Sequence, residues 1–240
     1  MNAEGPVPVV LFATCLVDSV RPDMTGQVLD LLERAGGAPV LARGATCCGQ
    51  PAFNAGFNKD AARVASRTVR ALDSSVGAIV VPSGSCATML LRHLPQLLAG
   101  TRWESAAKAV SGRVQELSTY LARRLPSTQS SADEAVAYHD SCHMLRELGE
   151  HEAPRALLAA AGHAVREMPG QDRCCGFGGT FSVKLPAISV AMADEKLDEA
   201  VATGARVLAS CDLSCVLHLD GRARRRGLPL EVCHLAEVLT

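Results

Sequence analysis

The sequence has little of several features that mark large classes of protein. Only 3% of its residues are aromatic and its net charge is −1, which argues against a nucleic-acid binder that uses positive charge and base stacking. No uninterrupted apolar run approaches about 18 residues, so we expect no transmembrane segment. The first residues carry an acid and no basic group, so we expect no secretory signal and a cytoplasmic protein. A hydrophobic fraction of 48% excludes an intrinsically disordered chain.

Cysteine is the residue type that stands out. Ten cysteines among 240 residues are too few for a disulfide scaffold, and a chain of this length buries enough surface to fold without disulfides. In a reducing compartment, clustered thiols indicate metal or redox chemistry. They are Cys15, Cys47, Cys48, Cys86, Cys142, Cys174, Cys175, Cys211, Cys215 and Cys233.

Eight of these cysteines recur in the same order. Three pairs are 127 residues apart and the fourth is 129 apart. The pairs are Cys15 with Cys142, Cys47 with Cys174, Cys48 with Cys175, and Cys86 with Cys215. A glycine follows each vicinal pair, and Val114–Leu117 resembles Val232–Leu235. The chain therefore consists of two copies of one unit of roughly 120 residues. We expect a first lobe at 1–126, a second lobe at 134–240 and a polar linker at about 127–133.

Each half alternates short apolar runs with amphipathic stretches. Strands are expected at 8–13, 38–41, 78–81, 135–138, from 163, and at 206–209. Helices are expected from a cap at Asp23 to residue 35, from 58 to 72, at 154–161 and at 182–202. This alternation predicts an α/β fold with a parallel sheet flanked by helices in each half. Because every repeated cysteine follows a strand, the thiols are expected to converge at one edge of each sheet.

Four thiolates in each half suit a soft or borderline metal, including zinc and iron–sulfur clusters. The chain has neither the two C-x2-C knuckles of a zinc ribbon nor the C-x2-C-x2-C run of a cubane ferredoxin. Adjacent thiolates reach different irons of a cluster more easily than they reach one small ion. Gly49 and Gly176 allow a tight turn after each pair, and Gly178 and Gly179 add N–H groups that tune a sulfur.

The order C-x31-CC followed by x37 or x39 and C resembles the cysteine-rich CCG domain. That domain occurs in heterodisulfide reductase and in the iron–sulfur subunits of glycolate oxidase and anaerobic glycerol-3-phosphate dehydrogenase. Segments 82–86, 138–143 and 174–184 look like signature segments of the lactate-utilisation protein A family. The resemblance covers essentially the whole chain. It implies two Rossmann-like lobes, iron–sulfur binding, and a part in oxidising L-lactate, a small 2-hydroxy acid, to pyruvate beside two partner subunits.

The chain departs from the heterodisulfide reductase pattern, which ends in C-x2-C. Met89 and His218 stand where each half lacks a fifth thiol, so a four-thiolate [4Fe–4S] cluster is the simpler interpretation. His218 is then a candidate metal ligand. Cys211, which aligns with Pro82, is either a spare thiol or a replacement ligand. We expect Cys233 to pack in a final strand.

Weaker signals leave further alternatives. His139 and His143 either move protons near the cluster or make structural hydrogen bonds. A hydrolase built on Cys142 and a histidine leaves the duplicated thiols unexplained. The glycines at 176–179 do not match the dinucleotide-binding pattern. A basic run at 222–226 is either a solvated helix end or a dock for an acidic partner.

Two functions remain open on the sequence alone. One is an iron–sulfur electron-transfer subunit of a lactate, glycolate or heterodisulfide type of oxidoreductase, which needs its partner subunits for activity. The other is a non-catalytic protein with zinc in one or both lobes, serving structure or redox sensing. We expect the second half to be the better cluster site, because it combines four thiols with the glycines at 176–179 and with nearby histidines.

Overall fold

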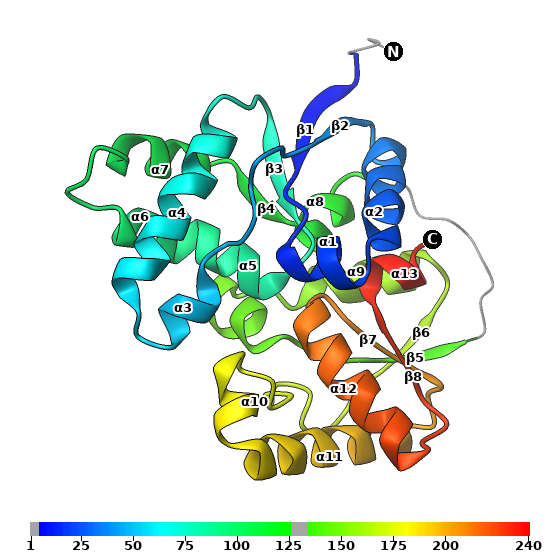
Figure 1. Cartoon of the computed structure of the whole chain (residues 1–240). Coiled ribbons are helices and arrows are strands. Elements are labelled where there is room, and N and C mark those ends of the chain that lie inside the picture. Colours follow the sequence, from blue (N-terminus) through cyan, green and yellow to red (C-terminus); the bar gives the residue numbers. More distant parts are fainter. Residues whose placement is uncertain (1–4, 126–133) are drawn as a thin grey trace. The chain divides into compact units, whose positions relative to one another are not determined.

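A computed structural model describes residues 5–125 and 134–240 of the chain. The chain divides into two compact units, Met1–Leu125 and Pro126–Thr240, which we call the first lobe and the second lobe (Figure 1). The expected linker at 127–133 lies outside the described residues.

The first lobe contains a parallel sheet in the order β2-β1-β3-β4. Its strands are β1 (Val7–Leu11), β2 (Gly37–Leu41), β3 (Ala78–Val81) and β4 (Val114–Glu116). In register, Val10 lies opposite Val40 on one side and Ile79 on the other. The helices are α1 (Cys15–Val20), α2 (Asp23–Arg34), α3 (Gln50–Asn54), α4 (Asn58–Asp73), α5 (Gly84–Thr88), the π-helix η1 (Met89–His93), α6 (Leu94–Leu97), α7 (Glu104–Ser111) and α8 (Leu117–Ala122).

The second lobe repeats this architecture with the order β6-β5-β7-β8. Its strands are β5 (Ala135–Tyr138), β6 (Ala164–Arg166), β7 (Val207–Ser210) and β8 (Glu231–His234). The helices are the π-helix η2 (Met144–Leu148), α9 (Glu152–Ala160), α10 (Thr180–Lys184), α11 (Pro186–Ala202), α12 (Leu213–Arg226) and α13 (Leu235–Val238). The predicted fold class, two duplicated lobes that each hold a small parallel sheet flanked by helices, is confirmed.

Burial accounts for the hydrophobic patterns. The side chains of Val10, Leu11 and Ile79 on the central strands are at most 1% exposed. Helix α4 buries the face that carries Ala61, Ala65, Val69 and Leu72. In Figure 1, α2 flanks the sheet of the first lobe on one side, and α4 with α7 flanks it on the other. A sheet covered on both faces requires continuously apolar strands, which explains the short apolar runs.

The end of each lobe shows the duplication at atomic detail. Glu116 directly precedes α8 and accepts a hydrogen bond from the backbone N–H of Ser118 at 2.7 Å. His234 directly precedes α13 and accepts one from the N–H of Ala236 at 3.1 Å. Both side chains cap a helix that follows the last strand directly, so the sequence similarity at these two places reflects equivalent structure.

Two local expectations were wrong. The helix expected at 182–202 is divided at Leu185, whose φ of −129° and ψ of 56° are not helical. Pro186 opens α11, and a residue before proline is disfavoured in the helical region, which explains the break. Helix α2 begins at Asp23 itself, after Pro22, and no side chain caps it. Asp23 instead places a negative charge in the first turn, where the helix dipole favours it.

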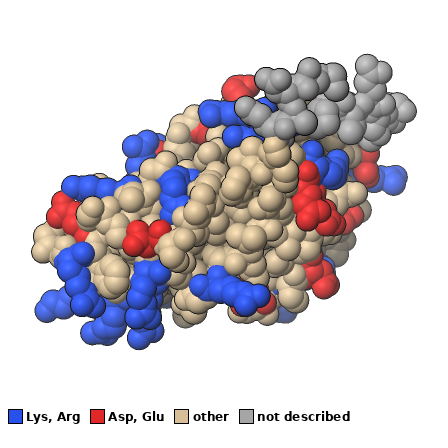
Figure 2. Space-filling view, turned by 90° about the horizontal axis from the view of Figure 1, so that it is seen from above, with Lys and Arg blue, Asp and Glu red and all other residues tan. Residues whose placement is uncertain are grey.

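The surface reflects the near balance of 24 basic and 25 acidic residues. Figure 2 shows Lys and Arg side chains together with Asp and Glu on the face that it presents, separated by wide uncharged areas. Within residues 5–125 and 134–240, no helix is both long and apolar enough to cross a bilayer.

Candidate metal centres

In each lobe the repeated cysteines lie just beyond the carboxyl ends of three neighbouring strands. In the first lobe, Cys15 opens α1, the pair Cys47–Cys48 precedes α3, and Cys86 lies in α5. In the second lobe, Cys142 precedes η2, Cys174–Cys175 follows β6, and Cys215 lies in the first turn of α12. None of the ten cysteines forms a disulfide.

The four thiols of the first lobe are linked to one another. The Cys48 thiol donates to Cys86 Sγ at 3.3 Å, and the N–H of Gly49 donates to Cys47 Sγ at 3.4 Å. Hydrogen bonds from the Cys15 and Cys48 thiols lower the pKa of Cys47 to about 2. The same bonds, together with burial, raise the pKa of Cys15 and Cys48. One sulfur is thus held as a thiolate, the form that binds metal, by neighbours that keep their protons.

The second lobe repeats this arrangement. The Cys175 thiol donates to Cys215 Sγ at 3.1 Å, and the N–H of Gly176 donates to Cys174 Sγ at 3.4 Å. Hydrogen bonds from the Cys142 and Cys175 thiols lower the pKa of Cys174 to about 2. The N–H of Phe177 also reaches Cys175 Sγ at 3.5 Å. Among the described hydrogen bonds, Gly176 and Phe177 therefore take the sulfur-tuning role that we expected of Gly178 and Gly179.

The glycine after each vicinal pair has a left-handed backbone, with φ of 90° at Gly49 and 91° at Gly176. The two positions differ in the room around them. A Cβ on Gly176 would lie 2.6 Å from the carbonyl oxygen of Ser189 in α11, whereas one on Gly49 would lie 3.4 Å from that of Ala61 in α4. The turn that carries Cys174 and Cys175 is consequently seated more tightly on its helix.

The surroundings of the second thiol set contain buried charge. Asp212 is 1% exposed and caps α12, accepting hydrogen bonds from the hydroxyl of Ser214 at 2.6 Å and from that of Ser141 at 3.3 Å. Lys196 is 2% exposed and donates to the carbonyl of Gly170, and burial lowers its pKa to about 8.

A second buried carboxylate, that of Asp140, pairs with a guanidinium. Arg155 donates to both of its carboxylate oxygens, at 3.0 and 2.9 Å, and also binds Glu167. Asp140 is 3% exposed. The equivalent position 127 residues earlier in the first lobe is Ala13.

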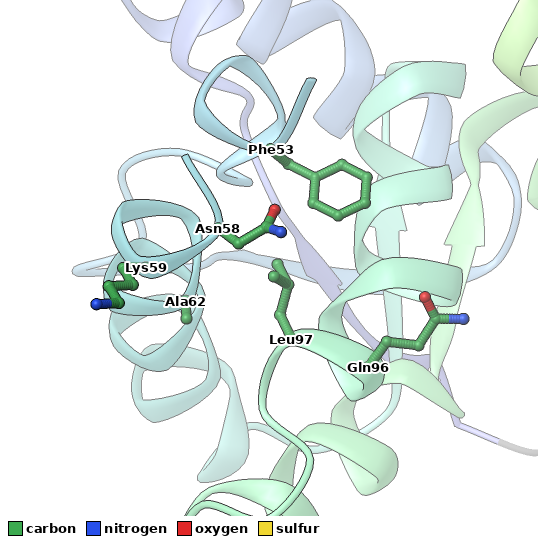
Figure 3. Close-up of a pocket in the computed structure, with 6 residues that line it drawn as sticks. All are labelled: Phe53, Asn58, Lys59, Ala62, Gln96 and Leu97. Carbon is green, nitrogen blue, oxygen red and sulfur yellow. The ribbon is translucent and has the colours of Figure 1, made fainter. Parts of the chain in front are cut away.

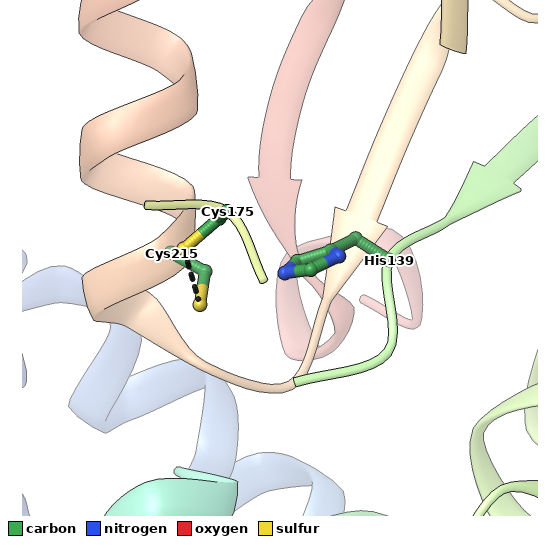
Figure 4. Close-up of side chains that lie close together, drawn as sticks. All are labelled: His139, Cys175 and Cys215. Carbon is green, nitrogen blue, oxygen red and sulfur yellow. Dashed lines mark hydrogen bonds between the residues drawn. The ribbon is translucent and has the colours of Figure 1, made fainter. Parts of the chain in front are cut away.

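His139 approaches two sulfurs of the second thiol set. A ring nitrogen of His139 and the sulfurs of Cys175 and Cys215 all lie within 4.8 Å of one another, and Figure 4 shows the ring turned toward the two sulfurs. The histidine is fully buried, and neither ring nitrogen has a well-formed hydrogen bond. Burial, with the nearby charge of Lys196, lowers the pKa of His139 to about 3, so the ring is neutral.

The other two histidines make different contacts. His143 Nδ1 is 3.7 Å from Cys142 Sγ, and its Nε2 is 3.8 Å from Glu147. His218 Nε2 lies 3.2 Å from the hydroxyl of Ser189, and its ring packs edge-on against Phe177. His218 therefore does not join the close group formed by His139 and the two thiols.

The remaining sequence signals are found within the second lobe. The hydroxyl of Tyr138 donates to Cys211 Sγ at 3.0 Å, and Cys233 lies in β8, paired with Ala209. The basic run is tied to neighbouring acids. Arg222 binds Asp194 through two hydrogen bonds of 2.7 and 2.8 Å. Arg226 and Arg224 form similar pairs with Asp198 and Asp220.

A cavity of about 270 Å³ opens beside the second thiol set. It is lined by Arg146, Arg173, Cys174, Met192, Glu195, Lys196 and Glu199. Another cavity, of about 440 Å³, lies in the first lobe and contains no cysteine (Figure 3). Its lining residues are Phe53, Asn58, Lys59, Ala62, Gln96 and Leu97.

Sequence reasoning missed Lys196, Asp212 and the arginines beside Cys174. One signal could have identified Asp212 as a helix cap. The duplication aligns it with Ser83, whose hydroxyl caps α5. Lys196 had none, since a lysine within a helical pattern indicates a surface residue.

Comparisons with known proteins agree with the two-lobe organisation. A family model described as "Cysteine-rich domain" matches residues 9–91 and 136–220, once in each lobe. "Lactate utilization protein A" of Halalkalibacterium halodurans is 40% identical over 234 residues, covering 96% of each chain. The chain belongs to the lactate utilization protein A family. A protein of the same name from Shouchella clausii is also 40% identical, over 96% of this chain and 98% of its own.

The fold of this family member also resembles a solved structure. A hypothetical protein from Helicobacter pylori superposes with a TM-score of 0.70 at 8% identity, over 98% of this chain. The chain spans about half, 49%, of that protein. At this identity the likeness shows the fold alone.

Proposed function

We propose that the chain is the iron–sulfur electron-transfer subunit of a complex that oxidises L-lactate, a small 2-hydroxy acid, to pyruvate. The observation that carries the proposal is the recurrence of four convergent thiols in both lobes. The name of the relatives, Lactate utilization protein A, supports the substrate. We further propose a cytoplasmic location, because ten unbridged thiols suit a reducing compartment.

The donor set fits a metal centre in each lobe. In the first lobe the proposed ligands are Cys15, Cys47, Cys48 and Cys86, and in the second they are Cys142, Cys174, Cys175 and Cys215. Five of these eight thiols hold their protons in the metal-free protein, as the raised pKa of Cys15, Cys48, Cys142, Cys175 and Cys215 indicates. A bound cation replaces those protons and offsets part of the negative charge of four crowded thiolates.

The two electrons that the substrate releases call for more than one iron–sulfur centre. Oxidation of a 2-hydroxy acid to a 2-oxo acid removes two electrons and two protons, and a bound iron–sulfur cluster supplies one-electron chemistry. Two centres in this chain, or one together with a centre in a partner subunit, accept the pair in succession. The sequence contains no flavin or nicotinamide signature, so we assign the substrate chemistry and the final acceptor to partner subunits. The chain's own contribution is to hold the clusters and to tune them through N–H groups of Gly49, Gly176 and Phe177.

A non-catalytic zinc or redox-sensing protein is the alternative, since four thiolates also form a structural zinc site. Glycolate or heterodisulfide chemistry is the alternative within the same class. Anaerobic purification separates the first two, because iron with labile sulfide and a brown colour supports the proposal, whereas stoichiometric zinc in a colourless protein contradicts it.

The ligand assignment has a matched control within the second lobe. Cys174→Ser or Cys175→Ser should remove most of the iron of that lobe. Cys233→Ser should leave it in place, because Cys233 lies in strand β8. Equal iron loss from all three variants would overturn the assignment.

A further inference from the structure

The two thiol sets differ at one equivalent position. His139 stands 127 residues after Phe12, the same offset that relates the cysteines. Each residue directly follows the central strand of its lobe. The backbone N–H of Phe12 donates to Val80 at 2.9 Å, and that of His139 donates to Ala209 at 2.8 Å. Both side chains are fully buried. One structural position is therefore occupied by a phenyl ring in the first lobe and by an imidazole in the second.

An imidazole is a costly choice at this position unless it has a partner. Buried polar groups in folded proteins are almost always hydrogen-bonded, and an unsatisfied one opposes folding. Neither nitrogen of His139 has a well-formed hydrogen bond among the described residues. Phenylalanine fills the equivalent space in the first lobe with no polar atom to satisfy. The backbone of Gln171 makes only a weak contact with the ring, so the histidine points to a stronger partner outside the polypeptide.

The neighbours of the ring show what that partner is. The sulfurs of Cys175 and Cys215 are 3.1 Å apart, and a ring nitrogen of His139 completes a group within 4.8 Å (Figure 4). Ligand atoms of one tetrahedral metal lie about 3.5–4 Å apart, given bonds of about 2.3 Å to sulfur and 2.0 Å to nitrogen. The two sulfurs are closer together than this and the nitrogen lies within 4.8 Å of both, so small side-chain shifts bring the three atoms to ligand spacing. Thiolate and imidazole together select borderline metals such as iron and zinc.

We propose that His139 supplies an imidazole nitrogen to the iron of the second lobe's metal centre, so that this centre has mixed sulfur and nitrogen ligation. The first lobe, with Phe12 in the same position, has sulfur ligation alone. This inference rests on the metal-binding part of the proposed function.

The first step of the test uses the metal-free protein. His139→Phe copies the first lobe and removes an unsatisfied polar group, so its melting temperature should equal or exceed that of the metal-free wild type. This result establishes that the variant folds. A lower melting temperature would mean that the protein itself satisfies the ring, which contradicts the premise.

The second step detects the bond in iron-loaded protein. Pulsed electron paramagnetic resonance of reduced protein with 15N-labelled histidine should show one strongly coupled nitrogen. That signal should vanish in His139→Phe and persist in the control variant His163→Gln, which alters another histidine of the second lobe. Only weak coupling, as from a hydrogen bond to sulfur, or strong coupling that survives in His139→Phe would overturn the proposal.

Metal analysis separates failure of the His139 ligand assignment from failure of the proposed electron-transfer function. If the protein contains zinc and no iron, the electron-transfer function is wrong. The ligand proposal is then tested at the zinc absorption edge. A nitrogen in the first shell that is lost in His139→Phe retains His139 as a metal ligand, and an all-sulfur shell rejects it.

Discussion

The turn after Cys174–Cys175 allows a quantitative prediction about how the second site is built. Gly176→Ala adds a Cβ to a residue with φ of 91°, 2.6 Å from the carbonyl oxygen of Ser189. The left-handed conformation costs a residue with a side chain about 1–2 kcal/mol. Overlap with a packed backbone atom costs about 1–3 kcal/mol more. The second lobe should therefore lose about 2–5 kcal/mol of unfolding free energy.

Two other glycines are matched controls. Gly149 has φ of 69° with no atom within 4 Å of an added Cβ, and Gly49 has φ of 90° with its nearest neighbour at 3.4 Å. Alanine at either position should cost only the conformational part, about 1–2 kcal/mol. Urea unfolding of the metal-free protein, followed by circular dichroism, gives the three values. Iron content should fall only in Gly176→Ala, because that change displaces two proposed ligands.

The reasoning fails if Gly176→Ala is no more destabilising than Gly149→Ala. It also fails if Gly176→Ala and Gly49→Ala have equal effects, since the contact with Ser189 is what separates them. Unchanged iron content in a clearly destabilised Gly176→Ala protein would show that the turn serves stability alone.

Three further predictions concern the buried charges and the complex. Burial lowers the pKa of Lys196 to about 8, so between about pH 8 and 10.4 this residue binds more protons in the unfolded chain than in the folded one. The wild type should therefore gain stability relative to Lys196→Met as the pH rises through this range. A difference in urea midpoints that does not change with pH would contradict this. Arg155→Met leaves Asp140 buried without its guanidinium and should cost about 3 kcal/mol, whereas Arg224→Met, at an exposed pair, should cost under about 1 kcal/mol. Cys142→Ser should abolish lactate-dependent reduction of an artificial acceptor while the complex still forms on size exclusion; retained activity would refute its role as a ligand.

The strands and the convergence of the cysteines followed from sequence because both depend on short-range patterns. Apolar runs such as 78–81 ended just before a cysteine, and the duplication repeated that order. Parallel sheets then place all such loops at one edge. The break at Leu185 is also readable from Pro186, because the residue before a proline is disfavoured in the helical region.

The polar surroundings of the second site depend on packing that no local pattern records. Lys196 occurs in an ordinary helical stretch, and only its approach to Gly170 makes it buried. His139 was a candidate from its closeness to Cys142 in sequence, yet it approaches Cys175 and Cys215. His218 was placed near the site by counting from Cys215, and the turn of α12 directs it to Ser189 instead.

We propose that this chain relays electrons from a 2-hydroxy acid through thiolate-bound iron. The most direct measurement mixes L-lactate with the anaerobically prepared, iron-loaded chain, first alone and then with its partner subunits, while the visible absorption of the clusters is recorded. We expect little change in this absorption for the chain alone and bleaching when the partner subunits are added. The complex that carries Cys142→Ser should show no bleaching. Absence of bleaching in an iron-loaded complex that turns over lactate, or full turnover by a complex whose chain has been freed of iron, would contradict the proposal.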